Sequence, residues 1–457
     1  PPIDRDGWER SLETYFPDAG SADQRAAART ACERGTSVVT GGPGTGKTTT
    51  IARLLGVLLT LEDEPLRVAL AAPTGKAAAR LSQAIGEATS RPDYPASTQD
   101  EVLRRDRIRA LEATTLHRLL GWRPDSSTRF RHDRSNPLPF DVVVVDETSM
   151  VSLSMTARLL EAMRPPARLV LVGDADQLAS VEAGAVLGDI VRGWSTGGSV
   201  RELTTTHRFG RNIRELAEAV RTGDADLVLG ILSEGRQEHE PGDGTVLRAS
   251  AGVELDERLR TQAVAMHQAA GRGDTASALS AFEGHRLLCA HRRGPAGVSH
   301  WNVHAERLLM EATHQEWLDE WYPGRPFIVN TNDRGLRLWN GDTGVTCVLP
   351  GVEPAAPGRL AGVVGDRSVA ARELPTTRLA DVSTAYAMTV HRSQGSQFDE
   401  VTVLLPDEGS RILTRELLYT AVTRARSTVR VVGSDEAIRV AVTRRAQRAT
   451  GLAGRLA

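Results

Sequence analysis

The sequence predicts an α/β protein with two parallel-sheet domains and a small β-barrel inserted in the second. Between Gly35 and Gly173, short β-branched runs alternate with helical patterns, and each run ends in Gly, Pro, Asp or Glu. This alternation is typical of a parallel, doubly wound sheet. A second set of such runs begins near residue 285. Between its members, Gly- and Pro-rich sequence up to about residue 374 indicates short strands joined by tight turns, which favours an inserted barrel.

The individual elements follow from the same patterns. The expected strands are 37–41, 67–73, 140–147 and 167–174 in the first domain, and 285–291, 400–406 and 428–433 in the second, with a helix over 414–424. Each strand of the first set leads into a polar or Gly-rich turn at its carboxyl end, where open α/β sheets bind ligands. Residues 121–140 are interpreted as a hairpin around "TRFRH", and residues 235–262 as a polar loop and its flank.

The predicted domain boundaries follow these elements. They are a remnant of an N-terminal region at 1–20, a first domain at 21–200 with its hairpin at 122–138, a second domain at 201–333 and 376–457, and the insertion at 334–375. The chain opens with Pro1 rather than Met, so we expect the natural protein to begin further upstream.

Composition excludes several classes of protein. The 457 residues include 56 Lys and Arg against 58 Asp and Glu, a net charge of -2, so any nucleic-acid surface must be a local patch. The three cysteines lie far apart without a CxxC pair, which argues against a structural zinc site and suits a reducing compartment. Apolar runs are only of strand length, and no secretory signal is visible, so neither a membrane span nor secretion is expected.

The stretch "GGPGTGKTTT" carries the strongest functional signal. It fits G-x-x-x-x-G-K-[ST] between a strand and a helix, the context in which backbone N–H groups and a helix N-terminus bind phosphates. Lys47 is one of only two lysines in the chain, and a compact ammonium group suits the β- and γ-phosphates. The predicted nucleotide-binding residues are Gly41, Gly42, Pro43, Gly44, Thr45, Gly46, Lys47, Thr48 and Thr49.

Acidic and amide side chains follow two later strands. Asp146 is predicted to hold Mg²⁺ together with Thr48, and Glu147 to orient and deprotonate the attacking water. Adjacent acids at a strand end can also simply cap the next helix. Gln177, after another strand, is a neutral donor for the γ-phosphate, although a surface turn would place a glutamine there as well.

The order of motifs closely resembles that of the RecD family of superfamily 1 helicases, the alpha subunits of the exodeoxyribonuclease V (RecBCD) complexes. The matching stretches are "GGPGTGKTTT", "APTGKAAARL", "TLHRLLG", "VVDETSM", "GDADQLASVEAGAVLGDI", "HRFG", "RLWNGDTG", "AMTVHRSQGSQFD" and "TRELLYTAVTRAR". The resemblance implies two RecA-like P-loop NTPase domains, an SH3-like barrel insertion, and the use of ATP with Mg²⁺. It also implies that Gln24 reads the adenine and that Arg208 and Arg424 reach the γ-phosphate.

The resemblance further implies a single-stranded DNA track across both domains. The matching positions are Thr74, Lys76, Thr115, His117, Thr389 and His391, whose donors suit phosphate oxygens. Phe130 and Arg131 match the hairpin that family members use to split the duplex. Two alternatives stay open: Lys76 can equally hold its loop in shape, and the hairpin can be an exposed basic turn without a role.

The motifs and the resemblance together predict an ATP-dependent DNA helicase. The resemblance implies 5′ to 3′ polarity and the role of motor subunit in a cytoplasmic, bacterial RecBCD heterotrimer with RecB-like and RecC-like partners, which processes DNA ends for recombinational repair. Nucleases associated with these helicases use a Glu-x-Lys element, whereas Thr-Gly precedes both lysines here, so cutting is expected on another subunit. The alternatives are a standalone RecD-like helicase, for which family members usually carry a long N-terminal extension, and a nucleotide-binding scaffold without motor activity.

Overall fold

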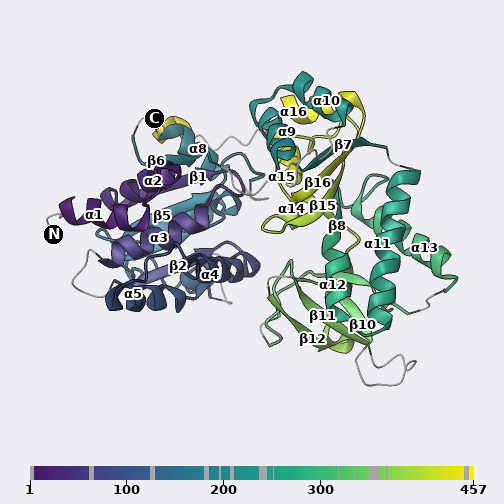
Figure 1. Cartoon of the computed structure of the whole chain (residues 1–457), viewed down its shortest axis with the longest axis horizontal. Helices are drawn as coiled ribbons and strands as arrows, with labels where there is room; N and C mark the ends of the chain where they lie inside the picture. Colours follow the sequence, from purple (N-terminus) through teal and green to yellow (C-terminus); the bar gives the residue numbers. More distant parts are fainter. Residues whose placement is uncertain are drawn as a thin grey trace. The chain divides into compact units, whose positions relative to one another are not determined.

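The chain forms two compact units. The computed structural model describes residues 5–60, 66–123, 129–179, 185–194, 197–205, 210–235, 244–250, 252–316, 319–333, 335–348, 360–366, 369–446 and 452–456. The first unit comprises Pro1–Arg208 with Gln447–Ala457, and the second comprises Phe209–Ala446 (Figure 1). Within the described ranges, no helix is both long and apolar enough to cross a membrane.

The first unit is built on a six-stranded sheet in which every pairing is parallel. In spatial order its strands are β3 (Ala113–Thr115), β2 (Val68–Ala72), β4 (Val142–Val145), β5 (Arg168–Gly173), β1 (Thr36–Gly41) and β6 (Val200–Leu203). Strands of such a sheet are covered on both faces and therefore need apolar residues at successive positions. β4 shows this most simply, because it consists of four buried valines.

Helices cover both faces of this sheet, which gives three layers. One face carries α1 (Arg5–Tyr15), α2 (Ala22–Glu33), α3 (Lys47–Thr60), α4 (Gly75–Thr89) and α5 (Gln99–Arg109). The other carries α6 (Leu116–Leu119), α7 (Leu153–Ala162), α8 (Val186–Gly193) and α17 (Ala453–Leu456). Two 3-10 helices, η1 (Ala19–Ser21) and η2 (Thr148–Met150), complete the unit. Side chains alternate between the faces along each strand: Val170 contributes to the first layer and Leu171 to the second.

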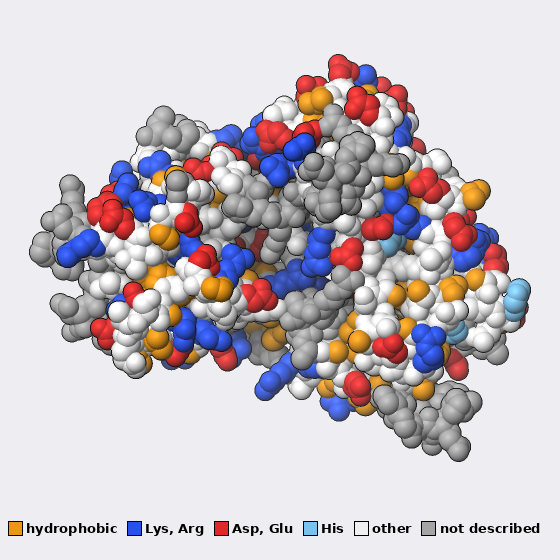
Figure 2. All heavy atoms as spheres, viewed as in Figure 1, with side chains coloured by type: hydrophobic (Ala, Val, Ile, Leu, Met, Phe, Trp, Pro, Cys, Tyr) orange, Lys and Arg blue, Asp and Glu red, His pale blue; other side chains and the backbone are white. Residues whose placement is uncertain are grey.

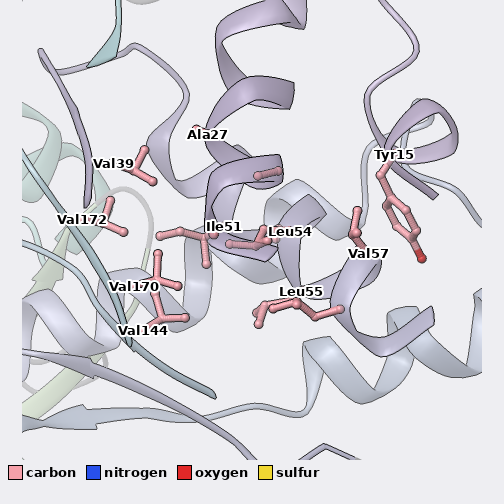
Figure 3. Packing of buried hydrophobic residues seen from close by; sticks show 14 of the residues in the cluster. Tyr15, Ala27, Val39, Ile51, Leu54, Leu55, Val57, Val144, Val170 and Val172 are labelled. Atoms are coloured by element: carbon pink, nitrogen blue, oxygen red, sulfur yellow. The ribbon is translucent and has the colours of Figure 1, made fainter. Parts of the chain in front are cut away.

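The helix α3 is held tightly on the sheet. Ile51, Leu54 and Leu55 are each at most 1% exposed. Figure 3 shows Ile51 beside Val170 of β5, and Leu54 and Leu55 belong to the same buried cluster. Full burial of one such side chain stabilises the fold by about 1.5 to 3 kcal/mol. The start of α3, where the phosphate-binding motif lies, therefore has a rigid support.

Both ends of the chain contribute to the first unit. The range 1–20, predicted as a remnant of an N-terminal region, supplies Leu12, Tyr15 and Phe16 to the core around α3, and Figure 3 shows Tyr15 beside Val57. The C-terminal helix α17 contacts α8, and a Cβ added to Gly193 would lie 2.6 Å from Leu456 Cβ. The prediction had grouped this terminus with the second domain.

The second unit contains a five-stranded parallel sheet. In spatial order its strands are β14 (Ala387–Thr389), β8 (His285–Cys289), β15 (Phe398–Leu404), β16 (Ala425–Val432) and β7 (Thr245–Ala249). Its helices are α9 (Arg211–Thr222), α10 (Ala225–Glu234), α11 (Val253–Gly271), α12 (Thr275–Gly284), α13 (Val298–Thr313), α14 (Val390–Ser393), α15 (Arg415–Val422) and α16 (Asp435–Thr443). The interpretation of residues 235–262 as a polar loop is wrong, because β7 and the first half of α11 lie there.

An antiparallel sheet is inserted between α13 and β14. In spatial order it consists of β12 (Val369–Pro375), β11 (Leu360–Asp366), β10 (Thr343–Val348), β9 (Pro326–Val329) and β13 (Val382–Thr384), with η4 (Thr376–Arg378) before β13. It extends beyond the predicted range 334–375 at both ends. It packs against α11 and α12, and at Gly324 the chain passes so close to α11 that a Cβ would lie 2.5 Å from His267 Cα.

Candidate functional site

The predicted nucleotide-binding segments meet at the carboxyl edge of the first sheet. The phosphate loop follows β1, and the segment with Gln177 follows β5, which pairs with β1. Asp146 follows β4, which pairs with β5 on its other side. Since these strands are parallel, their carboxyl ends lie at one edge, the edge at which open α/β sheets bind ligands. The topology thus brings the loop, Gln177 and Asp146 together.

The phosphate loop needs glycine because of its backbone conformation and because neighbouring side chains pack directly against it. Gly44 and Gly46 both have φ of 83°, a left-handed conformation that other residues rarely adopt. A Cβ on Gly46 would lie 2.5 Å from Gln24 Nε2. Gln24 projects from α2 and is 9% exposed. The absent side chain at Gly46 therefore lets Gln24 lie directly against the loop.

Lys47 is held over the same loop. Its ammonium group donates hydrogen bonds to the carbonyl oxygens of Gly41 at 2.6 Å and Gly42 at 2.9 Å. The Thr45 hydroxyl also donates to the Gly42 carbonyl, at 2.9 Å. The helix α3 begins at Lys47, so Thr48 lies in its first turn, where backbone N–H groups lack helical acceptors. This is an anion-binding arrangement of N–H groups, a helix N-terminus and one cation.

Two acidic residues follow the end of β4, and the first, Asp146, is close enough to Lys47 for their charges to interact. The backbone N–H of Glu147 donates to Asp146 Oδ1 at 2.8 Å. Glu147 itself has φ of 51°. Such a conformation costs about 1 to 3 kcal/mol and is concentrated at functional sites. Burial raises the pKa of Asp146, the charge of Glu147 raises it further, and the ammonium of Lys47 acts in the opposite direction.

Gln177 is held by a residue that the sequence analysis did not single out. Its Nε2 donates to Asp174 Oδ2 at 2.9 Å, and the backbone N–H of Asp176 donates to Asp174 Oδ1 at 3.1 Å. Gln177 is 6% exposed and Asp174 is 2% exposed. Thr40, at the end of β1, accepts a hydrogen bond from Ala175 N at 3.3 Å and joins this turn to the phosphate-loop strand. Gln177 is therefore buried rather than part of an exposed surface turn. The sequence feature that could have identified Asp174 is an acidic residue directly after a predicted strand.

Of the two arginines predicted to reach the γ-phosphate, Arg424 lies within the described residues. Arg208 lies outside the described residues. Arg424 follows α15 in the second unit and is 3% exposed. Its guanidinium donates to the carbonyl oxygens of Thr420 at 3.1 Å and Ser396 at 3.4 Å, and to the Thr423 hydroxyl at 3.3 Å. The bond to Ser396 links Arg424 to the segment that begins at β14.

The three threonines of the predicted DNA track share one structural role, because each caps a helix that follows a strand. The hydroxyl oxygens of Thr74, Thr115 and Thr389 accept from the N–H groups of Ala77 at 3.2 Å, Arg118 at 3.2 Å and Arg392 at 3.3 Å. Lys76, His117 and His391 lie in the first turns of the same helices, α4, α6 and α14. Capping explains why threonine occurs at these positions. A capping hydroxyl still has a proton to donate, so contact with DNA stays a prediction.

The base of the predicted hairpin is present. Phe130 forms an antiparallel bridge with Trp122, and Arg131 N donates to the Gly121 carbonyl at 2.9 Å. Residues 124–128, which precede Arg129 in the predicted hairpin, lie outside the described residues. The Phe130 ring packs against the second layer of the core, 6.2 Å from the His117 ring. Arg131 is exposed, and so is Trp122, at 39%, an aromatic residue that the sequence analysis did not single out.

Comparison with known proteins covers both units. Residues 24–183 match the AAA domain, and residues 384–432 match the UvrD-like helicase C-terminal domain. Over 442 residues the chain is 55% identical to the RecBCD enzyme subunit RecD of Mycolicibacterium smegmatis, which covers 96% of this chain and 75% of that protein. The chain belongs to the RecD family. The RecD-family resemblance of the motifs is thereby confirmed, and with it membership of superfamily 1 helicases.

Other RecD-family proteins align over similar lengths. The RecBCD enzyme subunit RecD of Haemophilus influenzae is 34% identical, over 97% of this chain and 74% of that protein. The ATP-dependent RecD2 DNA helicase of Deinococcus radiodurans is 32% identical, over 92% of this chain and 50% of that protein. A solved structure of Bacteroides Pif1 bound to single-stranded DNA is 16% identical, with a TM-score of 0.49, and covers 91% of this chain and 93% of that chain.

Proposed function

We propose that the chain is an ATP-driven DNA helicase, the RecD motor subunit of a RecBCD-type complex that unwinds double-strand DNA ends for recombinational repair. The observation that carries this proposal is the convergence of the phosphate loop, Asp146, Glu147 and Gln177 at one edge of a parallel sheet in a RecD-family chain. We also propose that it moves from 5′ to 3′ on its strand and that its two parallel-sheet units are RecA-like.

Each residue at this edge has a role that its position supports. The loop N–H groups and Lys47 bind the β- and γ-phosphates of ATP. Gln24, which lies against the loop at Gly46, reads the adenine. Glu147 orients the attacking water and accepts its proton. Gln177, fixed by Asp174, donates to the γ-phosphate. These groups stabilise charge that develops on the transferred phosphoryl group, which is the main task in this chemistry.

The same edge fits a magnesium ion. Thr48 and Asp146 supply the hard oxygen ligands that Mg²⁺ prefers, and phosphate oxygens and waters complete its shell in nucleotide sites. Burial raises the pKa of Asp146 most, and the charge of Glu147 raises it further; a divalent cation beside Asp146 would favour its ionised form and offset both effects. Held by Thr48 and Asp146, Mg²⁺ would neutralise part of the negative charge of the phosphates.

Arg208 and Arg424 complete the proposed ATPase. Arginines that reach a γ-phosphate typically accelerate its hydrolysis by about 10³ to 10⁵. The hydrogen bond from Arg424 to Ser396 O supports a link between hydrolysis and DNA, because Ser396 belongs to the segment that carries Thr389 and His391. ATP binding and hydrolysis would then alternate the grip on DNA, which is what a motor requires.

The proposed DNA track uses backbone contacts. Donors at Thr74, Lys76, Thr115, His117, Thr389 and His391 bind phosphates, which carry no sequence information and therefore suit a translocating enzyme. Phe130 and Arg131 belong to the hairpin proposed to split the duplex, in which Trp122 is the more exposed aromatic. The antiparallel sheet β9–β13 is proposed to be the SH3-like barrel that lies over the track.

The proposed partners are RecB-like and RecC-like subunits in a cytoplasmic heterotrimer. Neither lysine belongs to a Glu-x-Lys element, so we place the nuclease activity of the complex on another subunit. Basic and acidic side chains are interspersed over the face drawn in Figure 2, and the net charge of the chain is -2. A local DNA-binding surface on an otherwise mixed surface agrees with this picture.

ATP hydrolysis with and without single-stranded DNA tests the proposal. The protein is assayed alone and with its partner subunits, as wild type and as Lys47→Ala, Glu147→Gln and the control Arg109→Ala, an exposed cation at the end of α5. We expect DNA to stimulate hydrolysis, and Lys47→Ala and Glu147→Gln to lower this chain's share by at least about 100-fold. Glu147→Gln should still bind ATP, while Arg109→Ala should behave as wild type.

Two results would change the conclusion. If the rate of ATP hydrolysis changes neither with DNA nor with Lys47→Ala, the chain is a nucleotide-binding scaffold rather than a motor. If the wild-type chain unwinds DNA fully without partner subunits, the standalone RecD-like helicase replaces the RecBCD subunit.

A further inference from the structure

Two consecutive arginines occupy a turn at the carboxyl edge of the second unit's parallel sheet. The turn, residues 291–297, joins β8 to α13, and both Arg292 and Arg293 are exposed. In the sheet, β8 lies between β14 and β15, and all three strands are parallel. The turn therefore emerges beside the segment that follows β14, which carries His391. None of the roles proposed above uses these arginines.

The turn is rigid. Gly294 has φ of 94°, and a Cβ on Gly297 would lie 2.5 Å from the carbonyl carbon and oxygen of Arg293. The N–H of Gly297 closes the turn by donating to the Gly294 carbonyl at 2.9 Å. The His291 ring joins the turn to the segment after β15, with Nε2 2.8 Å from Ser410 Oγ. The two guanidinium groups thus project from a fixed backbone, which lowers the entropy lost when they bind a ligand.

A third arginine adds to the local positive charge. Arg392 lies in α14, directly after His391. Burial lowers the pKa of Arg392, the nearby charge of Arg292 lowers it further, and Asp381 acts in the opposite direction. Among the described residues, Arg292, Arg293 and Arg392 have no ion-pair partner within 4 Å. Like charges brought together without such a partner are unfavourable, so a bound anion would stabilise the arrangement.

Several arginines on the helices of this unit are paired with acids. Arg221, Arg260 and Arg439 form ion pairs with Glu218 at 2.8 Å, Glu257 at 2.6 Å and Asp226 at 2.6 Å. These pairs are the usual arrangement of a solvated helix surface. At the carboxyl edge near β8 and β14, the described residues supply no such pair for Arg292, Arg293 or Arg392.

We infer that Arg292, Arg293 and Arg392 form a binding site for the sugar-phosphate backbone of a single nucleic-acid strand, beside Thr389 and His391. This inference rests on the proposed helicase function and extends its DNA track to the turn between β8 and α13. Arginine suits this ligand because its guanidinium binds phosphate oxygens in pairs. Exposed cations on an open edge favour a polyanion, which gains from several contacts at once, over a single phosphate, which needs an enclosed set of donors.

Salt-dependent DNA binding tests the site. The full chain carrying Arg292→Gln and Arg293→Gln is compared with wild type and with the control Arg272→Gln/Arg307→Gln, which removes two exposed arginines at the end of α11 and on α13. The probe is a fluorescent 5′-hydroxyl oligodeoxythymidylate of about 20 nucleotides, long enough to cover several contacts. Fluorescence anisotropy gives its Kd at several salt concentrations, and thermal unfolding confirms that all variants are folded.

The expected result follows from counterion release. Each phosphate contact on a single strand contributes about 0.7 to the slope of log K against log salt, so losing two contacts should reduce the slope by about 1.4. The same reasoning predicts binding weakened by about 25-fold at about 0.1 M salt. The control should keep the wild-type slope. An oligonucleotide with neutral methylphosphonate linkages should bind wild type and the Arg292→Gln/Arg293→Gln variant equally.

The other outcomes are distinguishable. An unchanged slope in Arg292→Gln/Arg293→Gln, with DNA-stimulated ATP hydrolysis intact in wild type, overturns this site and leaves the helicase proposal standing. A wild-type protein that does not bind the strand overturns both. If inorganic phosphate at millimolar concentration abolishes the difference between wild type and variant, the turn binds free phosphate rather than the backbone, and the inference is wrong.

Discussion

Replacing Gly56 by alanine tests whether α1 supports the helix that carries the phosphate loop. A Cβ on Gly56, in α3, would lie 2.2, 2.5 and 2.8 Å from Cε1, Cζ and Cδ1 of Tyr15. Carbon atoms pack best about 3.5 to 4.0 Å apart, so all three contacts are repulsive. Tyr15 is 1% exposed, and its ring lies edge-on to Tyr94 with 5.6 Å between centroids. It therefore cannot move aside without disturbing the core.

The magnitude follows from two opposing terms. Overpacking a core costs about 1 to 3 kcal/mol, and three short contacts to a buried ring indicate the upper end of this range. Alanine inside a helix recovers about 1 kcal/mol relative to glycine. We expect Gly56→Ala to lower the free energy of unfolding by about 2 kcal/mol. For a unit of this size that corresponds to a Tm lower by about 4 to 8 °C.

Differential scanning calorimetry of the full chain measures this effect, and Gly86→Ala is the matched control. Gly86 lies within α4, and a Cβ there would meet nothing within 4 Å. We therefore expect Gly86→Ala to raise Tm by about 2 to 4 °C. In a Tyr15→Ala background, Gly56→Ala should become stabilising as well. If Gly56→Ala raises Tm in the wild-type background, as the control does, the packing of Tyr15 on α3 is refuted.

Three further predictions concern catalysis and pH. Asp174→Asn should lower kcat for DNA-stimulated ATP hydrolysis by about 10-fold to 100-fold with little change in KM, because Gln177 loses the carboxylate that orients it; a change confined to KM would contradict this. The Cβ of Gly395→Ala would meet no atom within 4 Å, but the alanine would have to adopt φ of 71°, which strains the segment bonded to Arg424. We expect this variant to have a lower ratio of DNA-stimulated to basal ATP hydrolysis. An unchanged ratio would count against a link between Arg424 and the DNA-binding segment. Burial lowers the pKa of His285 to about 3 from its ordinary 6.5, and the charges of neighbouring arginines lower it further. The neutral ring therefore contributes fully to stability above pH 6.5, and this contribution is lost as the pH falls toward 3. Urea unfolding between about pH 6 and pH 4 should show wild type losing up to about 1.4 kcal/mol per pH unit more than His285→Gln, whereas parallel losses would argue against a buried neutral ring.

The strands that the sequence predicted are the interior strands of the two parallel sheets. β1, β2, β4 and β5 in the first sheet, and β8, β15 and β16 in the second, were all expected, and the structure confirms them. Interior strands are covered on both faces and flanked by strands on both sides, so their residues form continuous apolar runs. The four strands that were not predicted, β3, β6, β7 and β14, are the four edge strands.

Edge strands gave no clear sequence signal for a physical reason. β6 (Val200–Leu203) has two exposed residues in four, and β3 (Ala113–Thr115) has only three residues, none of them fully buried. Their strand conformation is imposed by pairing with a neighbour, a tertiary effect that overrides local preference. The same explanation holds for β7, which lies in the range 235–262 interpreted as a loop and forms a strand by pairing with β16.

The candidate site divides in a similar way. The phosphate-loop residues, Asp146, Glu147 and Gln177 were identified because each belongs to a local pattern at a strand end. Asp174 was missed because its importance lies in its hydrogen bond to Gln177 rather than in its spacing. The Arg292–Arg293 turn was missed because more than fifty basic residues look alike until strand order places this pair beside the segment after β14.

The sequence by itself determined the local chemistry: a Gly-rich loop with one lysine, acids and amides at strand ends, and apolar runs that must form buried parallel strands. These features depend on residues that are neighbours along the chain, so their physical consequences are visible without coordinates. Only the tertiary structure decided the order of the strands, the packing of α1 on α3, the contact of Gln24 with Gly46 and the bond between Arg424 and Ser396. Each of these joins residues distant in sequence, and such contacts form only when burial of the two sheets and their helices brings the segments together.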